Sequence, residues 1–456
     1  MSIFNGKRLT DQVFKLDIER MRQGWYSDKY FENVYRMLTS LAASGYRYDG
    51  QFPLDMPHDV NQLDVGNLEV EVQFFTRRKG STLVVGVDKA LAMLRHCSGY
   101  GDENGDLVES WDKLEVWAMH DGDVTRYPPQ GNAGSGDPRH VQPAMRVRGR
   151  YRDFALLETP IVGALSRGSR IATNVYHTLV AARGKPVLFF PARFDAHEVQ
   201  AADGYAYDIA VQRFNQDYGE HVASLVSTDA QGDYWGGRGG GTVPHAVIAC
   251  FLGDTAAAML AFASTLPLDV PRIALVDFNN DSVRDSLHAL KAMFDRYRAL
   301  TEAGDEAEAL KYILFGVRLD TSGSMRDVGV PPLGDPTLDL GVNPRLVFTV
   351  RQALDTAWQS WGLPPHWEEK ARNYCQDVKI VVSGGFGPEK ISRFEKLEVP
   401  TDFYGVGSAL MSNDTRVGTN TDFTADVVRV RIAGEWVDMA KVGRRACDNL
   451  KMEQVW

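Results

Sequence analysis

The chain has 456 residues, of which 44% are hydrophobic and 24% charged, and its formal net charge is −10. This composition is typical of a soluble globular protein with two or three domains, and the negative charge argues against general nucleic-acid binding. The charged N-terminus lacks the apolar region of a signal peptide, and no apolar run of about 18 residues suggests a membrane span. The four cysteines lie far apart without a Cys-x-x-Cys motif, so a reduced, cytoplasmic location is the simplest expectation.

The first third of the chain has the pattern of an α+β region. Apolar residues recur at helical spacing over residues 16–41, whereas apolar and polar residues alternate over 68–74 and predict a strand. A second strand is expected over 82–87, followed by a helix over 89–96. Alternation returns near the C-terminus over 427–432, which suggests that the tail pairs with the N-terminal sheet.

From about residue 146 onward, short apolar segments alternate with helical ones. Near-continuous apolar strands separated by helices are typical of a parallel sheet, in a barrel or an open α/β arrangement. A long helix is expected to end at Arg183, and further helices over 281–303 and 344–361. The predicted strands are 154–157, 187–190, 224–228, 243–248, 273–277, 314–320, 378–383 and 402–406.

A glycine-rich stretch precedes one of these strands, with the sequence WGGRGGGTVPHAVI over residues 235–248. Glycine lets the backbone approach a ligand closely. We expect a loop, a short strand and a histidine, His245, placed to accept a phosphoryl group or a proton at neutral pH. The alternative interpretation is a flexible loop beside a core histidine.

Polar residues stand at the carboxyl end of every predicted strand in this half, where chemistry collects in parallel α/β folds. Two glycine pairs suggest a phosphate site made of backbone N–H groups, and two arginines add partners for phosphate or carboxylate. Asp277 and Asp320 are candidates for Mg²⁺ or ribose hydroxyls, although the sequence does not settle the metal ligands. The residues at the strand ends are Glu158, Arg193, Thr228, Asp229, His245, Asp277, Arg318, Asp320, Ser383, Gly384, Gly385, Gly405, Gly407 and Ser408.

Taken together, these motifs resemble the nicotinate phosphoribosyltransferase family, one of the type II phosphoribosyltransferases. The order and spacing match from about residue 26 to 430, and the combination of G-T-V-P-H with V-R-L-D-T is the most specific part. The segments that carry the resemblance are Glu158-Thr159-Pro160, Phe190 to His197, Gly241 to His245, Val276-Asp277, Gly316 to Thr321, Ser383 to Gly385, Tyr404 to Ser408 and Asp422 to Val427.

The resemblance implies an α/β fold, namely an incomplete or irregular α/β barrel with a discontinuous α+β sandwich domain built from both chain ends. We accordingly expect the sandwich domain at 1–149 plus 413–456 and the barrel domain at 150–412. The resemblance also implies a homodimer with active sites at the subunit interface. The implied reaction joins nicotinate to phosphoribosyl pyrophosphate, giving nicotinate mononucleotide and pyrophosphate with ATP hydrolysis, in NAD salvage.

The resemblance assigns roles to individual residues. His245 matches the histidine that ATP phosphorylates, and Asp320 and Glu158 are the further catalytic candidates, with Mg²⁺ and ATP as expected cofactors. Phe190 and a partner subunit's Tyr30 match the two aromatic residues that sandwich the pyridine ring. The other substrate-binding candidates are Arg193, Thr228, Asp229, Thr242, Asp277 and Arg318, and the phosphate-binding candidates are Ser383, Gly384, Gly385, Gly405, Gly407 and Ser408.

Three positions depart from the family pattern. The strand ending at Asp320 continues Thr-Ser-Gly-Ser, without the second acid of many relatives, and Ala192 precedes Arg193 where many relatives have a second arginine. Asp229 lies where relatives that use nicotinamide have an aspartate, which would repel a carboxylate. We expect Asp229 to serve as a helix cap or ribose ligand and nicotinate to be the base. Nicotinamide phosphoribosyltransferase and a non-catalytic nucleotide-binding relative remain the alternatives.

Overall fold

The computed structural model describes residues 7–50, 59–102, 107–128, 137 and 139–456. The chain forms two compact units, and both chain ends contribute to the first. The first unit contains Met1–Tyr176, Tyr205–Arg213 and Ser412–Trp456, and the second contains His177–Gly204 and Phe214–Met411. Three of the four boundaries fall inside two long helices, α4 (Glu158–Ala181) and α5 (Gln200–Tyr218), and the fourth follows Met411.

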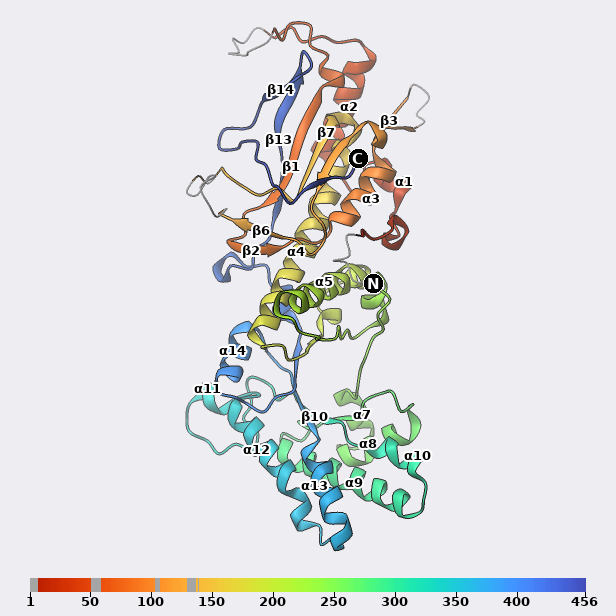
Figure 1. The fold of residues 1–456 in the computed structure, drawn as a ribbon, viewed down its shortest axis with the longest axis vertical. Helices are drawn as coiled ribbons and strands as arrows, with labels where there is room; N and C mark the ends of the chain where they lie inside the picture. Colours follow the sequence, from red (N-terminus) through yellow and green to blue (C-terminus); the bar gives the residue numbers. More distant parts are fainter. Residues whose placement is uncertain (1–6, 51–58, 103–106, 129–136, 138) are drawn as a thin grey trace. The chain divides into compact units, whose positions relative to one another are not determined.

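The first unit is built on a six-stranded sheet with the order β14-β13-β1-β7-β5-β15, and Figure 1 shows β1, β7, β13 and β14 side by side. The predicted pairing of the tail with the N-terminal sheet is confirmed, because β13 runs antiparallel to β1. The strands of the whole first unit are β1 Glu69–Thr76, β2 Gly80–Leu83, β3 Gly99–Gly101, β4 Leu107–Glu109, β5 Glu115–Ala118, β6 Val124–Tyr127, β7 Met145–Arg150, β13 Phe423–Ile432, β14 Glu435–Asp438 and β15 Glu453–Gln454. Its shorter helices are α1 Ile18–Arg22, α2 Lys29–Ala43 and α3 Val87–Cys97.

Alternation along β1 sorts its side chains between a core face and a polar face. Val70, Val72 and Phe74 are buried in one apolar core with residues of α3 and of the first turns of α4. Glu71, between them, is also buried, but it lies on the opposite face and pairs with Arg148 at 2.6 Å and Arg429 at 3.2 Å. The unit therefore has one apolar layer under helices and one face stabilised by ion pairs.

The second unit contains the predicted parallel strands. Its strands are β8 Val187–Phe189, β9 Ile273–Leu275, β10 Gly316–Leu319, β11 Lys379–Val382 and β12 Phe403–Val406. Its helices are α6 Asp229–Gly232, α7 His245–Cys250, α8 Thr255–Thr265, α9 Ser282–Glu302, α10 Glu306–Ala309, α11 Pro336–Asp339, α12 Pro344–Thr356, α13 Pro365–Gln376 and α14 Pro388–Lys396.

The strand order shows why this unit is an incomplete barrel. The parallel order is β9-β10-β11-β12-β8, and single bridges then continue from Phe189 to Val226 and from Val226 to Gly239. From β9 to β12, each strand pairs with the next strand in the sequence. The last of them, β12, pairs with the first strand of the unit, β8, as in an α/β barrel. In the described chain no pairing joins Gly239 to β9, so the barrel stays open on that side.

Two predicted strands of this half are wrong. Residues 155–157 form a short 3-10 helix, and the segment after Pro244 forms helix α7 instead of the strand expected over 243–248. The periodicity of a short apolar run does not show whether it forms a strand or a buried helix. Both segments also contain alanine, the residue with the highest helix propensity. The strand expected at 224–228 is reduced to its single bridges at Val226.

The helix predicted over 281–303 is confirmed as α9, whereas the one predicted over 344–361 is α-helical only to Thr356 and continues as a 3-10 helix; the starts of both follow from local chemistry. The Asp281 side chain accepts a hydrogen bond from the Arg284 amide at the start of α9, and Asn343 does the same for Leu346 at the start of α12. These two helices pack against each other and against α13, and α9 also packs against α8, which contacts β9 (Figure 1). No helix in the described residues is both long enough and apolar enough to cross a membrane.

Candidate functional site

A cavity of about 830 Å³ lies in the second unit, where the carboxyl ends of the barrel strands meet. Most of the residues proposed from the sequence line it, because parallel strands deliver the residues that follow them to one edge. The predicted site residues in its wall are Phe190, Arg193, Thr242, His245, Arg318, Asp320, Ser383, Gly384, Gly385, Gly405, Gly407 and Ser408.

His245 lies at the start of α7 beside two carboxylates. Its Nε2 is 2.9 Å from Oδ1 of Asp277, and ligand atoms of His245, Asp277 and Asp320 all lie within 4.8 Å of one another. Burial raises the pKa of Asp277, the charge of Asp320 adds to this rise, and His245 opposes it. With Nε2 bound to Asp277, the other ring nitrogen, Nδ1, is left to act as a nucleophile.

Arg318 brings a partly unsatisfied cation into the same cavity. Its Nη2 lies 3.4 Å from the carbonyl of Val243, while its Nε is buried without a hydrogen-bond partner among the described residues. Burial lowers the pKa of Arg318, Asp320 and Asp277 raise it, and the nearby positive charge of Arg193 lowers it. Two guanidinium groups therefore act on the same space, an arrangement suited to a phosphate or a carboxylate.

The loop after β11 places a serine hydroxyl and a glycine pair beside Asp320. Ser383 donates a hydrogen bond to Oδ1 of Asp320 at 2.8 Å. Gly384 and Gly385 adopt φ values of +84° and +69°, which favour glycine, and a Cβ on Gly384 would lie 3.2 Å from Oδ1 of Asp320. This backbone leads directly into α14, whose N-terminus adds its dipole to the loop.

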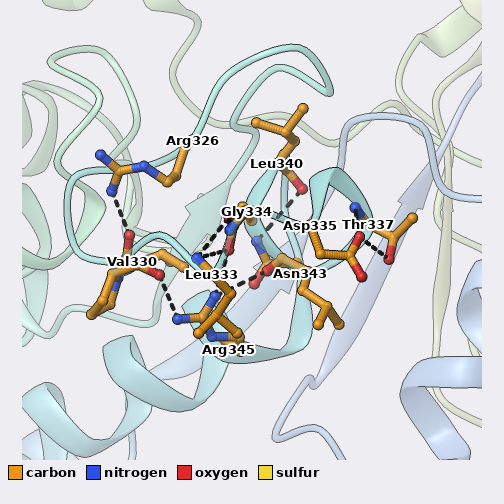
Figure 2. A network of polar contacts seen from close by, with 12 residues as sticks. Arg326, Val330, Leu333, Gly334, Asp335, Thr337, Leu340, Asn343 and Arg345 are labelled. Carbon is orange, nitrogen blue, oxygen red and sulfur yellow. Dashed lines mark hydrogen bonds and ion pairs between the residues drawn. The ribbon is translucent and has the colours of Figure 1, made fainter.

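The long segment after β10 is anchored by its own polar network (Figure 2). Arg345 donates to Asp339 at 2.7 Å and to the carbonyl of Pro331 at 2.5 Å, and Asp339 also accepts from the amide of Leu333. Arg326 donates to the carbonyl of Val330 at 2.5 Å (Figure 2). These contacts tie residues 326–345 of this segment to one another.

Two glycines allow aromatic rings to approach the strand ends. A Cβ on Gly405 would lie 2.6 Å from the Phe190 ring, and one on Gly407 would lie 2.5 Å from the Phe194 ring. Any side chain at either position would displace a ring. The two glycines proposed for phosphate binding thus also position the aromatic side chains.

Thr228 and Asp229 serve local structure. Thr228 caps α6 and donates to Gln200 at 2.8 Å, whereas Oδ1 of Asp229 accepts from the Gly239 amide at 2.9 Å. Neither residue lines the cavity, but the preceding Ser227 does. Gly239 is needed here because a Cβ would lie 2.7 Å from the Thr228 backbone.

The two remaining candidates belong to the first unit. Tyr30 lies near the start of α2 and its side chain is 60% exposed. Glu158 begins α4 and accepts from the hydroxyl of Tyr151 at 3.1 Å. Burial raises the pKa of Glu158 to about 7, against the lowering effect of the Tyr151 hydrogen bond.

Some residues of the cavity wall were not predicted. Ser227, Phe194, Arg238 and Phe386 all line it. Arg238 lies inside the glycine-rich stretch, so a cation flanked by glycines was an available signal. Phe386 follows the glycine pair directly, but an apolar side chain at that position does not by itself indicate that it lines a binding site.

Comparisons with known proteins agree with this architecture. No family model matches the chain. The structure is similar to a nicotinate-nucleotide pyrophosphorylase from Pyrococcus furiosus, with 25% sequence identity and a TM-score of 0.61 over 94% of this chain and 80% of that one. It also shares its fold with human nicotinic acid phosphoribosyltransferase, at 15% identity and a TM-score of 0.52 over 89% of this chain and 74% of that one.

Proposed function

We propose that the chain is a nicotinate phosphoribosyltransferase, which joins nicotinate to phosphoribosyl pyrophosphate. The proposal is supported by a fold similar to that of a nicotinate-nucleotide pyrophosphorylase and by strand-end motifs that resemble the nicotinate phosphoribosyltransferase family. The products are nicotinate mononucleotide and pyrophosphate, a reaction of NAD salvage. The observation that carries this proposal is the cavity in which His245, Asp320, two arginines and two glycine loops meet at one edge of the barrel.

In the proposed reaction the lone pair of the pyridine nitrogen forms a bond to ribose C1 while the bond from C1 to pyrophosphate breaks. Positive charge develops on the ribose ring, and the carboxylate of Asp320, fixed by Ser383, stabilises it. Arg193 and Arg318 neutralise anionic groups of the substrates, and the N–H groups at Gly384 and Gly385 bind phosphate oxygens.

ATP is proposed to phosphorylate His245. The Nδ1 lone pair attacks the γ-phosphorus, the bond to ADP breaks, and the proton on Nε2 stays shared with Asp277. Asp277 thereby stabilises the positive charge that the ring acquires. Hydrolysis of the phosphohistidine then couples ATP to the transfer.

Mg²⁺ fits the two carboxylates of this cluster. One oxygen of Asp277 contacts His245 and one oxygen of Asp320 accepts from Ser383, which leaves their second oxygens as hard ligands for the ion. Bound there, Mg²⁺ would supply charge neutralisation for pyrophosphate.

The choice of nicotinate rests on the surroundings of the base. Arg193 and Arg318 favour an anion, whereas the carboxylate of Asp229 is bound to the Gly239 amide and is absent from the cavity wall. An acid that repels nicotinate would have to face the base. Ser227 lines the wall instead, with its hydroxyl donating a hydrogen bond to Gln231 at 3.1 Å.

A homodimer is part of the proposal. Tyr30 and Trp25 are both exposed, at 60% and 68%, and aromatic residues are enriched where proteins associate. In a dimer, a partner's Tyr30 would provide the second face of the sandwich around the pyridine ring, opposite Phe190.

The test is product identification by mass spectrometry after incubation of the full chain with phosphoribosyl pyrophosphate, Mg²⁺, ATP and either base. Nicotinate mononucleotide is expected. Formation of nicotinamide mononucleotide alone would favour the nicotinamide enzyme, and substrate binding without either product would indicate a non-catalytic relative.

A further inference from the structure

The first turn of α14 contains a cation in an unfavourable place. Lys390 is the third residue of this helix, where the helix dipole favours acids over cations. Its side chain is partly buried, and burial lowers the pKa of its ammonium group to about 8. Burial alone accounts for this shift, so no acid among the described residues offsets it. Lys390 is therefore a cation for which the chain itself provides no anion.

Two contacts hold the Lys390 ammonium group beside the glycine pair that follows β11. Its Nζ donates to the carbonyl oxygen of Gly384 at 3.4 Å and lies 4.1 Å from the centre of the Phe386 ring. This ring is itself fixed, because it is buried and packs edge-on against Phe394, with 5.0 Å between the ring centres. An ammonium group is attracted to the face of an aromatic ring. Phe386 thus supports the position from which Lys390 reaches the Gly384 carbonyl.

The Gly384 carbonyl decides where the next amide points, because the C=O and N–H groups of a trans peptide point in opposite directions. Gly384 and Gly385 line the cavity, whereas Lys390 is not part of its wall. A carbonyl held by Lys390 therefore leaves the Gly385 N–H to face the cavity. This N–H forms no backbone hydrogen bond within the described chain. It is thus available to donate to a phosphate oxygen of a ligand.

The glycine pair does not fix this orientation by itself. Both glycines have positive φ, and glycine tolerates the conformations on either side of a peptide reversal. A reversed peptide would turn the Gly384 carbonyl oxygen toward the cavity, and an acceptor would then replace the donor that a phosphate group needs. The charged ammonium group of Lys390 opposes this reversal because it binds the carbonyl on the other side.

The other ionisable groups around the turn are already engaged or lie away from it. Asp320 accepts a hydrogen bond from the neighbouring serine hydroxyl, and Glu395 accepts from both Tyr404 and Lys185. The segment Ser408–Met411, which packs against the start of α14, has no ionisable side chain. The remaining ionisable residues of α14 and of the end of α4 line a separate groove: His177, Arg183, Glu389, Arg393 and Lys396.

We propose that Lys390 is a positioning residue, which binds the Gly384 carbonyl and thereby directs the Gly385 N–H at a phosphate group of phosphoribosyl pyrophosphate. This inference deepens the proposed function and rests on it for the identity of the ligand. Lys390 acts through the turn because it lies outside the cavity wall. A bound phosphate group supplies the anion that the chain lacks, so the ligand in turn stabilises the charged form of Lys390.

The first experiment measures the Kd of phosphoribosyl pyrophosphate by calorimetry at pH 7, with the full native chain and with Lys390→Met. Methionine keeps an apolar chain over the Phe386 ring but removes the charge. Kd is expected to rise roughly tenfold, the effect of one lost hydrogen bond from a charged group, whereas the Kd of nicotinate stays unchanged. An unchanged Kd of phosphoribosyl pyrophosphate, or an equal loss for both ligands, would overturn the proposal.

The pH dependence tests the charge. Arginine stays charged at every pH of the experiment, so Lys390→Arg is expected to restore binding at pH 7. Between pH 7 and pH 9 the native Kd is expected to rise by about fivefold as Lys390 loses its proton, whereas the Kd of Lys390→Arg stays level. Parallel pH profiles of the two proteins, or no restoration by arginine, would contradict a role of this charge.

The orientation of the peptide is read from NMR of protein labelled with ¹⁵N-glycine, in which Gly385→Ala identifies the Gly385 amide signal. Phosphoribosyl pyrophosphate is expected to shift this signal in the native chain and much less in Lys390→Met at equal occupancy. Equal shifts would overturn the role of the turn.

A matched control is Lys370→Met on α13, where Nζ lies 5.1 Å from the centre of the Trp367 ring and outside the cavity wall. This variant loses a similar contact with an aromatic ring and should bind phosphoribosyl pyrophosphate like the native chain. The same loss of affinity in Lys370→Met would contradict the proposal.

Turnover separates this inference from the proposed function. Formation of nicotinate mononucleotide by a chain whose Lys390→Met variant binds phosphoribosyl pyrophosphate normally would refute only the role of Lys390. Binding that depends on Lys390, in a protein that forms no mononucleotide, would support the inference and refute the proposed reaction.

Discussion

Replacement of Asp277 by asparagine isolates the contribution of one charged hydrogen bond to the proposed phosphorylation of His245. The His245 Nε2 and Asp277 Oδ1 atoms are 2.9 Å apart, and the Asp277 side chain is 9% exposed. Asparagine keeps an acceptor oxygen of similar position but removes the negative charge that stabilises a cationic ring. A hydrogen bond to a charged group contributes about 1.5–3 kcal/mol, so we expect phosphorylation to slow by roughly 10-fold to 150-fold.

The assay is the initial rate of phosphate transfer from radiolabelled ATP to the protein, followed by assignment of the modified ring nitrogen by NMR. Because Nε2 is bound to Asp277, the label is expected on Nδ1 of His245 and absent from His245→Ala. Asp269→Asn makes the same change on an exposed acid outside the cavity wall and should label at the native rate. A loss that additional Mg²⁺ restores would identify Asp277 as a metal ligand only. Labelling of Asp277→Asn at the native rate, or on Nε2, would refute the reasoning.

The remaining predictions concern the base, the dimer and stability. Phe190→Ala should raise the KM for the base about fivefold, from the ~1 kcal/mol of a lost aromatic contact, and leave the KM for phosphoribosyl pyrophosphate nearly unchanged; equal losses would place Phe190 in the core. Mixing Tyr30→Ala with Phe190→Ala chains should restore one intact site per heterodimer, and no recovery of activity would contradict a shared site. Asp229→Ser should keep the preference for nicotinate in kcat/KM, whereas a reversal from nicotinamide to nicotinate would show that Asp229 selects the base. Burial raises the pKa of Glu158 to about 7, so the folded state favours the neutral carboxyl group. The contribution of Glu158 to the free energy of unfolding is therefore fully present below about pH 4.5 and is lost as pH rises through 7. Glu158→Gln should therefore reduce the fall in unfolding free energy between pH 5 and 8, measured in urea, and an unchanged fall would contradict that shift.

The gathering of the site could be predicted because it follows from topology. The barrel strands are short and parallel, so the residues that follow them, such as Phe190 after β8 and Asp320 after β10, meet at one edge. Their mutual distances could not be predicted. The contact between His245 and Asp277 joins residues 32 positions apart and depends on where α7 begins.

The start of α7 is also where the sequence was misleading. Residues 243–248 have a strand-like apolar run, but Pro244 is extended and the next six residues turn into a helix. The same run carries alanine at positions 246 and 249, and the helical choice leaves the barrel open between Gly239 and β9.

Glycine content alone could not separate two different uses of glycine in this site. Gly232, Gly237 and Gly239 are required by close packing, because a Cβ would lie 2.0 Å from the Gly237 backbone, 2.2 Å from the Trp235 ring and 2.7 Å from the Thr228 backbone, respectively. Gly384 and Gly385 have open space or only an acid beside them, and their positive φ values point instead to a turn that exposes N–H groups. An alanine in the first group should therefore impair folding, whereas an alanine at Gly385 should impair phosphate binding in a folded protein. The glycine-rich stretch that is most conspicuous in the sequence thus mainly builds the barrel edge, and the less conspicuous pair after β11 is the better candidate for binding phosphate.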